Sequence, residues 1–339
     1  MKHFCLSVLI LITSVTVLCA CVSTNESGGS KPSNAKKGSF EIAVIDFADI
    51  PSHNNCLDGF KKGLEDEGLT EGKKLKITYS NAECDLALLD ELTEEIASKD
   101  VDLVFAISSP AAVSAFDACR DRDIPVVYAA VSDPIAAGLA DESGSSSGNI
   151  TGTSDELLVD HQLQLIRDIM PDAKKLGILY TTAEVNSVSA LESYKSLAGD
   201  YGFEIIEKPI KNRKAVKKAA KKLSKQVDCI SNLTDNTVVS ALKAELKMAR
   251  KAGIPVFGSE EEQVREGCIA CEGVDYKKLG TEAGSMSARI LKGEAEAGDI
   301  SFKEFSTGEI FLNQGMANRL GITFSDAVRS SATEVFKGF

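Results

Sequence analysis

The chain of 339 residues has no tryptophan and only three histidines, and aromatic side chains make up just 6% of it. So little histidine leaves almost no material for metal binding or acid–base catalysis by imidazole groups. Basic residues are also in the minority, because 38 lysines and arginines face 50 acidic residues and give a net charge of −12. Such an acidic chain lacks the positive field that draws proteins to nucleic acid, so we expect no nucleic-acid partner.

What the chain does contain is the composition of a soluble globular protein, with 43% hydrophobic and 26% charged residues. This is too apolar for general disorder. A single hydrophobic core rarely grows beyond about 250–300 residues. The length therefore predicts two lobes.

Long apolar runs are missing except for one near the start, between Phe4 and Ala20. Lys2 and His3 precede this run, which is typical of a signal peptide, and the run is short for a membrane-spanning helix. It ends at Leu18-Cys19-Ala20-Cys21, which resembles the lipobox of bacterial lipoprotein signals. An ordinary secretory signal, cleaved nearby, is the alternative.

These features predict a lipoprotein signal peptide over residues 1–20 and a lipid, including palmitate, on Cys21. Residues 21–40 are rich in serine, glycine and asparagine, and such a stretch is typical of a flexible tether. We expect a folded protein that is anchored by its lipid to the extracytoplasmic face of a cell membrane.

Six cysteines lie beyond the signal region: Cys56, Cys84, Cys119, Cys229, Cys268 and Cys271. Six cysteines in an exported chain are consistent with disulfides. Their apolar surroundings favour small core residues instead. The Cys268-Ile269-Ala270-Cys271 spacing has no second cysteine or histidine pair for zinc, so we predict no metal site.

From residue 41 onward, strand and helix patterns alternate. Short apolar runs such as 101–107 and 124–130 predict buried strands, and runs with helical spacing follow them. A turn-rich loop is expected over 48–55, and a continuous helix over 238–252. Two such series predict an α/β protein with two Rossmann-like lobes, each a parallel sheet flanked by helices.

Polar clusters follow several of these predicted strands, where ligands bind in open parallel sheets. The candidate binding residues are Ser108, Ser109, Ser132, Glu184, Asn186, Ser187, Asp235, Asn236 and Asp275. Any one of them is also a favoured helix N-cap. Their recurrence at one edge of two sheets favours a polar ligand-binding cleft.

Ordered motifs give the chain a family resemblance. They are Ser108-Ser109-Pro110-Ala111-Ala112, Ala129-Ala130-Val131-Ser132-Asp133-Pro134, Gly148-Asn149-Ile150-Thr151-Gly152, Glu184-Val185-Asn186-Ser187, Thr234-Asp235-Asn236-Thr237 and Gly273-Val274-Asp275-Tyr276. With these motifs the chain, from about residue 41 to its end, resembles the substrate-binding lipoproteins of ABC transporters whose better-studied members bind aromatic amino acids. Their fold is the type I periplasmic-binding fold.

The resemblance implies a hinge of three segments between the lobes. Residues 41–156 and 276–300 are then expected in lobe 1, and residues 157–275 and 301–339 in lobe 2. The implied function is capture of a small polar ligand, an amino acid and first of all an aromatic one, between the lobes. An ABC permease and its ATPase are the implied partners of a monomer that is not an enzyme and has no cofactor.

An amino acid needs donors for its carboxylate and acceptors for its ammonium group. Ser108, Ser109 and the helix start behind them suit the carboxylate. Asp235 or Asp275 suits the ammonium group. Asn186 and Asn236 suit either end.

The family's His-Pro-Ala-Leu-Asp-like loop is replaced here by Asp49-Ile50-Pro51-Ser52-His53-Asn54-Asn55, which changes the rim of the cleft. His53 is expected to be a solvated loop residue, and His161 a structural helix residue. A basic helix around residues 211–222 is interpreted as a solvated face, with a permease-binding or lipid-binding patch as the alternative.

Three other functions remain open at this stage. A periplasmic enzyme is disfavoured, because the chain contains no GxSxG, HExxH or Walker-type motif. A sensory receptor of the same fold differs only in its membrane partner. A nucleoside or sugar binder is disfavoured by the few aromatic rings.

Overall fold

The computed structural model describes residues 38–305 and 308–338, and the region Asn34–Phe339 forms one compact unit. The predicted signal peptide, Cys21 and the tether up to residue 37 lie outside the described residues. Folded structure begins at Phe40, one residue inside the expected tether. Within the described residues, no helix is both long enough and apolar enough to cross a bilayer.

The first sheet has six parallel strands in the order β11-β5-β4-β3-β1-β2. Their bounds are β1 Phe40–Asp46, β2 Leu75–Asn81, β3 Leu103–Ile107, β4 Val126–Ala129, β5 Ile150–Ser154 and β11 Lys303–Glu304. All five residues of β3 are buried, as expected of a central strand that is covered on both faces.

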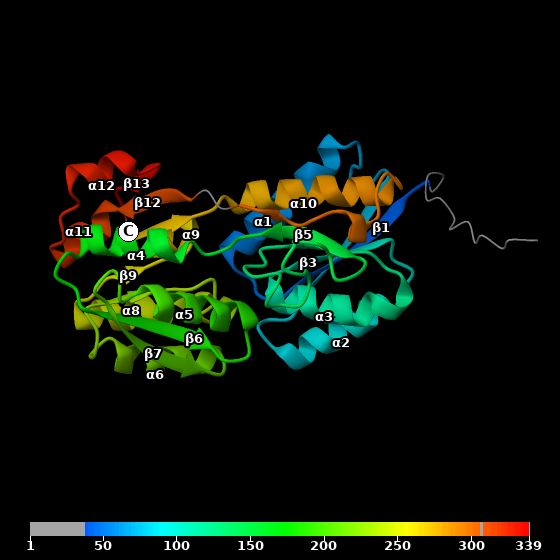
Figure 1. The fold of residues 1–339 in the computed structure, drawn as a ribbon. Coiled ribbons are helices and arrows are strands. Elements are labelled where there is room, and N and C mark those ends of the chain that lie inside the picture. The colour runs from blue at the N-terminus through cyan, green and yellow to red at the C-terminus, as the bar shows by residue number, and fades with distance from the viewer. Residues whose placement is uncertain (1–37, 306–307, 339) are drawn as a thin grey trace, which may run out of the picture. The chain divides into compact units, whose positions relative to one another are not determined.

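Four main helices cover this sheet: α1 (Pro51–Asp66), α2 (Leu86–Ala97), α3 (Ser109–Cys119) and α10 (Tyr276–Leu291). Ile42 and Val44 of β1 pack toward α1 and α10, whereas Ala43 and Ile45 pack toward α2 and α3. Alternate residues of the strand therefore belong to two separate cores. Figure 1 shows α1 and α10 on one side of the sheet and α2 and α3 on the other. We call this sheet and its four helices the first lobe.

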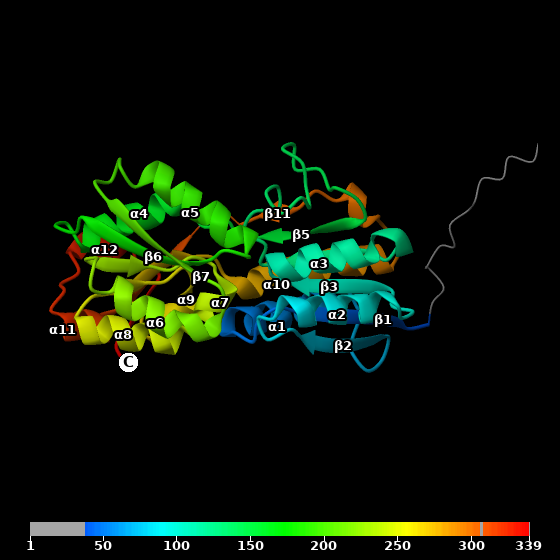
Figure 2. The same cartoon turned by 90° about the horizontal axis from the view of Figure 1, so that it is seen from below.

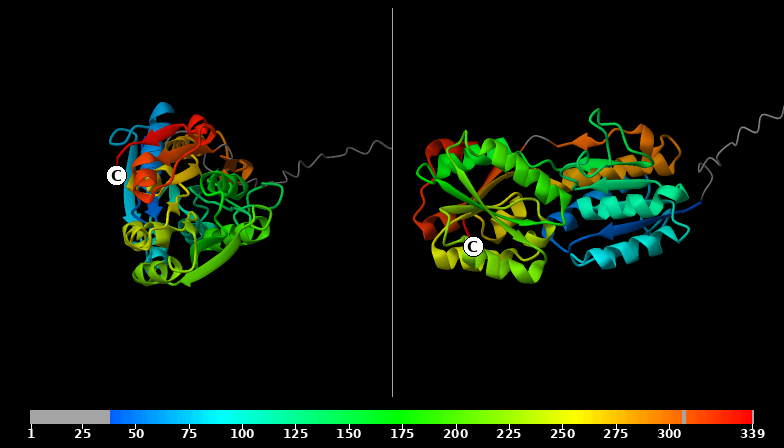
Figure 3. Two further views of the ribbon diagram at one scale, coloured as in Figure 1. Left: turned by 90° about the vertical axis from the view of Figure 1, so that its left-hand side faces the viewer. Right: turned by 60° about the horizontal axis from the view of Figure 1, so that its bottom comes forward.

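A second parallel sheet has the order β7-β6-β8-β9, with β6 Lys175–Thr181, β7 Glu204–Ile210, β8 Cys229–Ser231 and β9 Val256–Phe257. Helices α4 (Val159–Ile169) and α5 (Val185–Leu197) cover one face through Ile166 and Tyr194. Helices α6 (Arg213–Leu223) and α8 (Leu242–Ala252) cover the other face (Figure 3).

A third, mixed sheet continues the second one. It consists of β10 (Ala270–Gly273), β12 (Glu309–Asn313) and β13 (Glu334–Phe336), and β10 and β12 are antiparallel. The Gly258 N–H donates to the Ala270 carbonyl at 2.9 Å, which joins the two sheets at the end of β9. The short helices α7 (Asn236–Val239), α9 (Glu261–Glu266), α11 (Gln314–Leu320) and α12 (Asp326–Ser331) complete the second lobe.

The predicted α/β class with parallel-sheet lobes is confirmed, but several details of the prediction are wrong. Residues 303–304 were expected in lobe 2, yet they pair with Thr153 and Ser154 of the first sheet. Two short 3₁₀ helices at Arg120–Arg122 and Ala297–Asp299 and strands β5, β12 and β13 were also not anticipated. Such short elements are fixed by their neighbours, because their own sequences carry little periodicity.

Two helices differ from the prediction as well. Helix α1 already begins at Pro51, inside the expected loop, because proline suits the first helical turn. The helix expected over 238–252 is two helices, since Ala241 leaves helical geometry with φ −114° and ψ 16°. Helix α8 then starts afresh and turns Leu242 and Leu246 toward the sheet.

Four glycines let α1 and α10 approach each other closely. A Cβ atom on Gly280 would lie 1.8 Å from the Cys56 carbonyl oxygen, and one on Gly59 would lie 2.1 Å from that of Lys277. A Cβ atom on Gly63 or on Gly284 would likewise clash with backbone atoms of the facing helix. Because the facing atoms are backbone, no side-chain movement relieves the contact.

The six cysteines beyond the signal region are free thiols, and all but Cys84 are buried. They pack within the apolar clusters of both lobes. Burial raises the pKa of the Cys268 and Cys271 thiols well above the ordinary value, so both are held as neutral core side chains.

Candidate functional site

Polar side chains stand at the carboxyl ends of four neighbouring strands in the first sheet. Asp46 ends β1, Ser108 follows β3, Ser132 follows β4 and Asp155 follows β5. Because parallel strands share one carboxyl edge, these residues lie along one edge in the order β5-β4-β3-β1. The sequence predicted the two serines and missed the two aspartates.

Ser108 and Ser109 begin helix α3, and each is only 1% exposed. Within the described residues neither hydroxyl has a hydrogen-bond partner. Ser108 also holds a φ of 91°, which a residue with a side chain rarely adopts. Buried hydroxyls are normally paired, and strain gathers where ligands are held. Together with the amide groups of the first turn of α3, the two serines suit an anionic group.

Asp155, directly after β5, is the centre of a buried network. Its carboxylate accepts from the Ser132 hydroxyl at 3.1 Å and from the Tyr276 hydroxyl at 2.6 Å. The Ser132 Oγ also lies 2.8 Å from the Thr234 Oγ1 of the second lobe. Burial raises the pKa of Asp155 to about 6, and the two hydroxyl donors and the nearby His53 limit that rise.

Glu184, just before α5, holds the start of helix α7. Its carboxylate accepts from the backbone N–H and the Nδ2 of Asn236, at 2.9 and 2.7 Å. It also accepts from the backbone N–H and the hydroxyl of Thr237, at 3.0 and 2.6 Å. Burial raises the pKa of Glu184 to about 7, and the neighbouring Asp235 adds to the rise. Four donors leave this carboxylate in a structural role.

Asp235 is fully buried and joins three elements of the second lobe. It accepts from the Thr181 N–H (2.6 Å) and hydroxyl (2.9 Å) at the end of β6. It also accepts from the Ser187 hydroxyl of α5 (2.7 Å) and caps α7 through the Val238 N–H (2.8 Å). Its pKa is raised by burial. The predicted site residue Ser187 is thus a partner of Asp235.

Asn186 has one half of its amide unpaired. Its Nδ2 donates to the Thr234 carbonyl at 2.7 Å, which fixes the orientation of the amide. Its Oδ1 is buried and has no partner within the described residues. Asn186 therefore presents a free acceptor beside the Ser132–Thr234 contact.

Asp275 lies apart from this set. Its side chain is 38% exposed, caps α10 through the N–H groups of Lys277 and Lys278, and forms an ion pair with the Lys278 ammonium group at 3.4 Å. The structure thus shows Asp275 as a helix cap with a surface partner.

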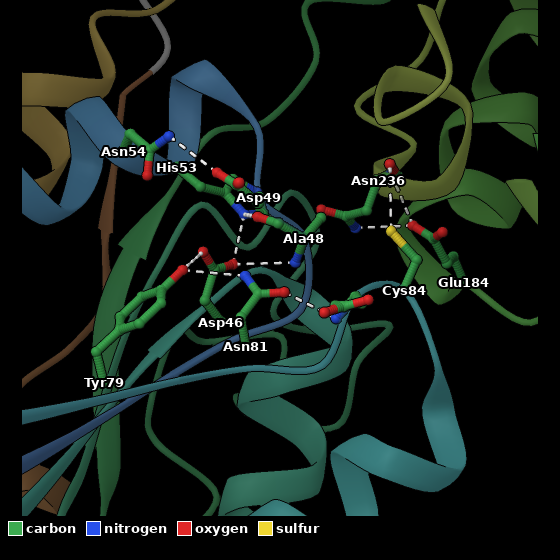
Figure 4. A network of polar contacts seen from close by, with 11 residues as sticks. Asp46, Ala48, Asp49, His53, Asn54, Tyr79, Asn81, Cys84, Glu184 and Asn236 are labelled. Carbon is green, nitrogen blue, oxygen red and sulfur yellow. Dashed lines mark hydrogen bonds and ion pairs between the residues drawn. The ribbon is translucent and has the colours of Figure 1, made fainter.

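His53 was expected to be a solvated loop residue, and that expectation is wrong, because its side chain is only 4% exposed. Its Nδ1 lies 2.7 Å from Asp46, and Asp46 also accepts from the Tyr79 hydroxyl at 2.9 Å (Figure 4). The carboxylates of Asp46, Glu260 and Asp155 outweigh the effect of burial and raise the pKa of His53. The signal for this site in the sequence was Asp46, an acidic residue at the end of an apolar strand.

Direct contacts join the two lobes around this site. Asn55 of α1 donates to Glu262 of α9 at 2.6 Å, and the Ser189 hydroxyl donates to Asp133. The Cys84 thiol lies 3.9 Å from the Asn236 carbonyl oxygen, as Figure 4 shows. Ser132, Asp133, Asn186 and Ser189 line a hollow of about 140 Å³ beside the contact between Ser189 and Asp133. Predicted residues of both lobes, among them Ser132, Asn186 and Asn236, thus meet at this junction.

Metal chemistry finds no support at this junction. Across residues 38–305 and 308–338, no group of three or more histidine, cysteine, aspartate or glutamate side chains is placed to hold a metal ion. What the junction offers is a set of hydroxyl donors, amide acceptors and buried carboxylates. These groups can recognise a small molecule that has a charge at each end.

The buried acids predict that stability falls as the pH rises. Burial raises the pKa of Glu184 and Glu260 to about 7 and that of Glu245 to about 8. Between pH 5 and 8 the unfolded chain releases these protons first, so the folded state becomes relatively less stable. The raised pKa of His53 acts in the same direction. We expect the melting temperature to drop by at least about 5 °C from pH 5 to pH 8.

A Glu245→Gln variant provides the control for this prediction. Glu245 is fully buried, and the Asn232 amide donates to it at 3.0 Å. Removing its ionisation should flatten the fall in melting temperature above pH 6. A melting temperature that rises steadily from pH 5 to pH 8 would contradict the assignment.

Comparison with known proteins identifies the family of this chain. Residues 41–336 match the family model for ABC transporter substrate-binding proteins. A tyrosine-binding protein of Clostridioides difficile is 35% identical over 306 residues, covering 89% of this chain and 88% of that protein. An uncharacterised protein of Rickettsia prowazekii is 23% identical over 273 residues, covering 80% of this chain and 82% of that protein.

Two solved structures differ in how closely their folds match that of this chain. An ABC domain from Streptococcus pneumoniae in complex with L-Trp is 30% identical, with a TM-score of 0.85 over 88% of this chain and 100% of that one. The ligand-free, open structure of a substrate-binding protein with adhesive properties from Clostridium difficile is 33% identical over the same shares, but its TM-score is 0.65. At similar sequence identity, the fold of this chain therefore superposes better on the L-Trp complex than on the open structure.

The family model covers most of the chain, and the tyrosine-binding relative is matched over most of its length. The chain belongs to the family of ABC transporter substrate-binding proteins.

Proposed function

We propose that this chain is the extracytoplasmic solute-binding component of an ABC importer and that its solute is an amino acid, with tyrosine and tryptophan as the first candidates. The likeness to a tyrosine-binding protein and to an L-Trp complex supports this class of ligand. The carrying observation is that three buried polar atoms of predicted site residues lack a hydrogen-bond partner within the described part of the chain: Ser108 Oγ, Ser109 Oγ and Asn186 Oδ1.

These atoms match the two ends of an amino acid. The hydroxyls of Ser108 and Ser109 can donate to the carboxylate, and the first turn of α3 favours its negative charge. Asn186 Oδ1 can only accept, so it suits the ammonium group. Asp235 was an earlier candidate for that end, but its oxygens already accept from four donors, and we therefore assign it a supporting role.

Capture and release then depend on the two lobes. Ser108 and Ser109 belong to the first lobe and Asn186 to the second, so a ligand reaches both half-sites only when the lobes are closed. We propose that the permease takes up the solute from this closed form. The lipobox-like sequence supports anchoring of the protein to the extracytoplasmic membrane face through a lipid on Cys21.

The test is calorimetric titration with L-tyrosine, L-tryptophan and L-phenylalanine. A hydrogen bond to a charged group is worth about 1.5–3 kcal/mol, or roughly 10–100-fold in affinity. The double variant Ser108→Ala, Ser109→Ala should therefore raise the Kd for the bound amino acid by at least about 10-fold. Ser98→Ala, at the exposed end of α2, is the matched control and should leave the Kd unchanged.

Tyramine, which is tyrosine without its carboxylate, separates the two ends of the ligand. If the serines hold the carboxylate, the double variant should bind tyramine as well as the unmodified chain does. Binding of none of the three amino acids, or binding of a sugar or nucleoside instead, would overturn the proposed ligand class.

A further inference from the structure

Helix α6 and its two flanks carry cations on their whole outer face. Between residues 209 and 227 the chain has eight basic residues and no acidic one. All eight are exposed: Lys211, Arg213, Lys214, Lys217, Lys218, Lys221, Lys222 and Lys225. The inner face is apolar and packs on the sheet through Val216, Ala220 and Leu223.

Helix α8 extends this surface in a way that the sequence does not reveal. Lys243, Lys247 and Lys251 recur every four residues along α8, and all three are exposed. Leu246 and Ala249 of α8 share one core cluster with the inner face of α6, so the two helices lie side by side (Figure 2). The acid of α8, Glu245, is fully buried. We call the eight basic residues of the α6 segment and these three lysines the cationic face.

The cationic face has no counter-ions of its own. Within the described residues, none of its eleven side chains forms an ion pair, whereas many other exposed lysines and arginines do. In a chain with a net charge of −12, a concentrated positive surface of this kind is an exception. Local repulsion among these side chains is relieved when an anionic surface approaches.

We propose that the cationic face binds an anionic phospholipid surface. Lysine accounts for ten of its eleven residues, and its ammonium group is a hydrated point charge that suits a diffuse field rather than bidentate pairing with a protein carboxylate. Clusters of lysine on an amphipathic helix are a recognised means of attraction to acidic lipid headgroups.

A protein partner fits this surface less well. Protein interfaces depend on apolar and aromatic anchors that fill pockets. The exposed large apolar side chains of the described residues are Tyr79, Leu86, Ile135 and Val188, and none lies on α6 or α8. The electrostatic attraction of lysines to a membrane needs no such anchor.

The inference rests on the proposed function in one respect, because export and a lipid at Cys21 would place the chain beside a bilayer. A basic patch is a common further signal beside a lipid anchor, and it would orient the anchored chain on the membrane surface. Contact through α6 and α8 would turn one side of the second lobe toward the membrane.

The test uses the chain from residue 21 onward with Cys21→Ser, so that no lipid contributes. Its co-sedimentation is measured with vesicles of phosphatidylcholine alone and with vesicles that contain equal parts of phosphatidylglycerol. We expect binding to the anionic vesicles only, with affinity falling as salt is added. The variant Lys217→Gln, Lys218→Gln, Lys221→Gln, Lys222→Gln should bind at least about 10-fold more weakly.

The matched control changes the net charge equally in the first lobe, with Lys62→Gln, Lys73→Gln, Lys74→Gln and Lys99→Gln, all exposed positions. This control should bind the anionic vesicles within about twofold of the parent chain. Equal losses in both variants, equal binding to neutral vesicles, or no binding of the parent chain would overturn the inference. Affinity for L-tyrosine, measured in parallel, should stay unchanged in both variants, so failure of the proposed ligand would be seen separately.

Discussion

The Asp235→Ala variant is expected to lose about 3–5 kcal/mol of unfolding free energy, measured by urea denaturation. Asp235 is completely buried and accepts from Thr181, Ser187 and Val238, which belong to β6, α5 and α7. Alanine would leave two buried backbone N–H groups and two buried hydroxyls without an acceptor. Leaving such groups unpaired is more unfavourable than losing the average hydrogen bond.

The same change should also weaken ligand binding, because α5 carries Asn186 and the carboxylate holds the start of that helix through Ser187. Asp275→Ala is the matched control. Asp275 is likewise an aspartate at a helix N-cap, but its side chain is 38% exposed, so only about 1 kcal/mol should be lost. Similar losses in both variants would show that Asp235 acts as a cap and not as the centre of a network.

The Gly280→Ala variant is expected to lose about 3 kcal/mol of unfolding free energy. The added Cβ would lie 1.8 Å from the Cys56 carbonyl oxygen and 2.8 Å from the Phe60 backbone nitrogen. Both atoms belong to the backbone of α1, so the two helices would have to move apart. The separation would disturb Phe60, Leu64 and Leu279, which are fully buried between the helices and the sheet.

Gly199→Ala is the control for this second change. A Cβ at Gly199 would meet no atom within 4 Å, and the backbone there has no positive φ. We expect its stability to stay the same or to rise by up to about 1 kcal/mol, because alanine restricts the unfolded chain. If thermal or urea denaturation gave Gly280→Ala the stability of the parent chain, the close contact between α1 and α10 would be refuted.

The regular elements were the easiest to predict. Runs such as Leu103–Ile107 are apolar throughout, because a central parallel strand is covered on both faces. The buried strands expected over 101–107 and 124–130 contain β3 and β4. Strands β11 and β13 were not predicted, because two or three residues are too few to show a hydrophobic period. Their pairing partners also lie far away in the chain.

The candidate site, like the fold, was only partly predictable from the sequence. Loops after strands pointed to serine, asparagine and acidic residues, and several of them, such as Ser132, Asn186 and Asn236, lie at the junction of the lobes. The roles of these residues were not predictable from the sequence. Glu184 and Asp235 were predicted to bind the ligand, yet their carboxylate oxygens accept hydrogen bonds from backbone N–H groups and hydroxyls of the protein itself. His53 and Glu260 were missed, since only folding brings α1 and the segment before α9 together.

The sequence by itself determined the α/β class, the polar edge of the sheets and the family, because each depends on local periodicity or on ordered motifs. Only the tertiary structure decided which polar groups are already paired, how closely α1 and α10 approach, and that the lysines of α8 lie beside those of α6. These features depend on contacts between residues distant in sequence. No local pattern encodes such contacts, because each partner becomes defined only when the other is in place.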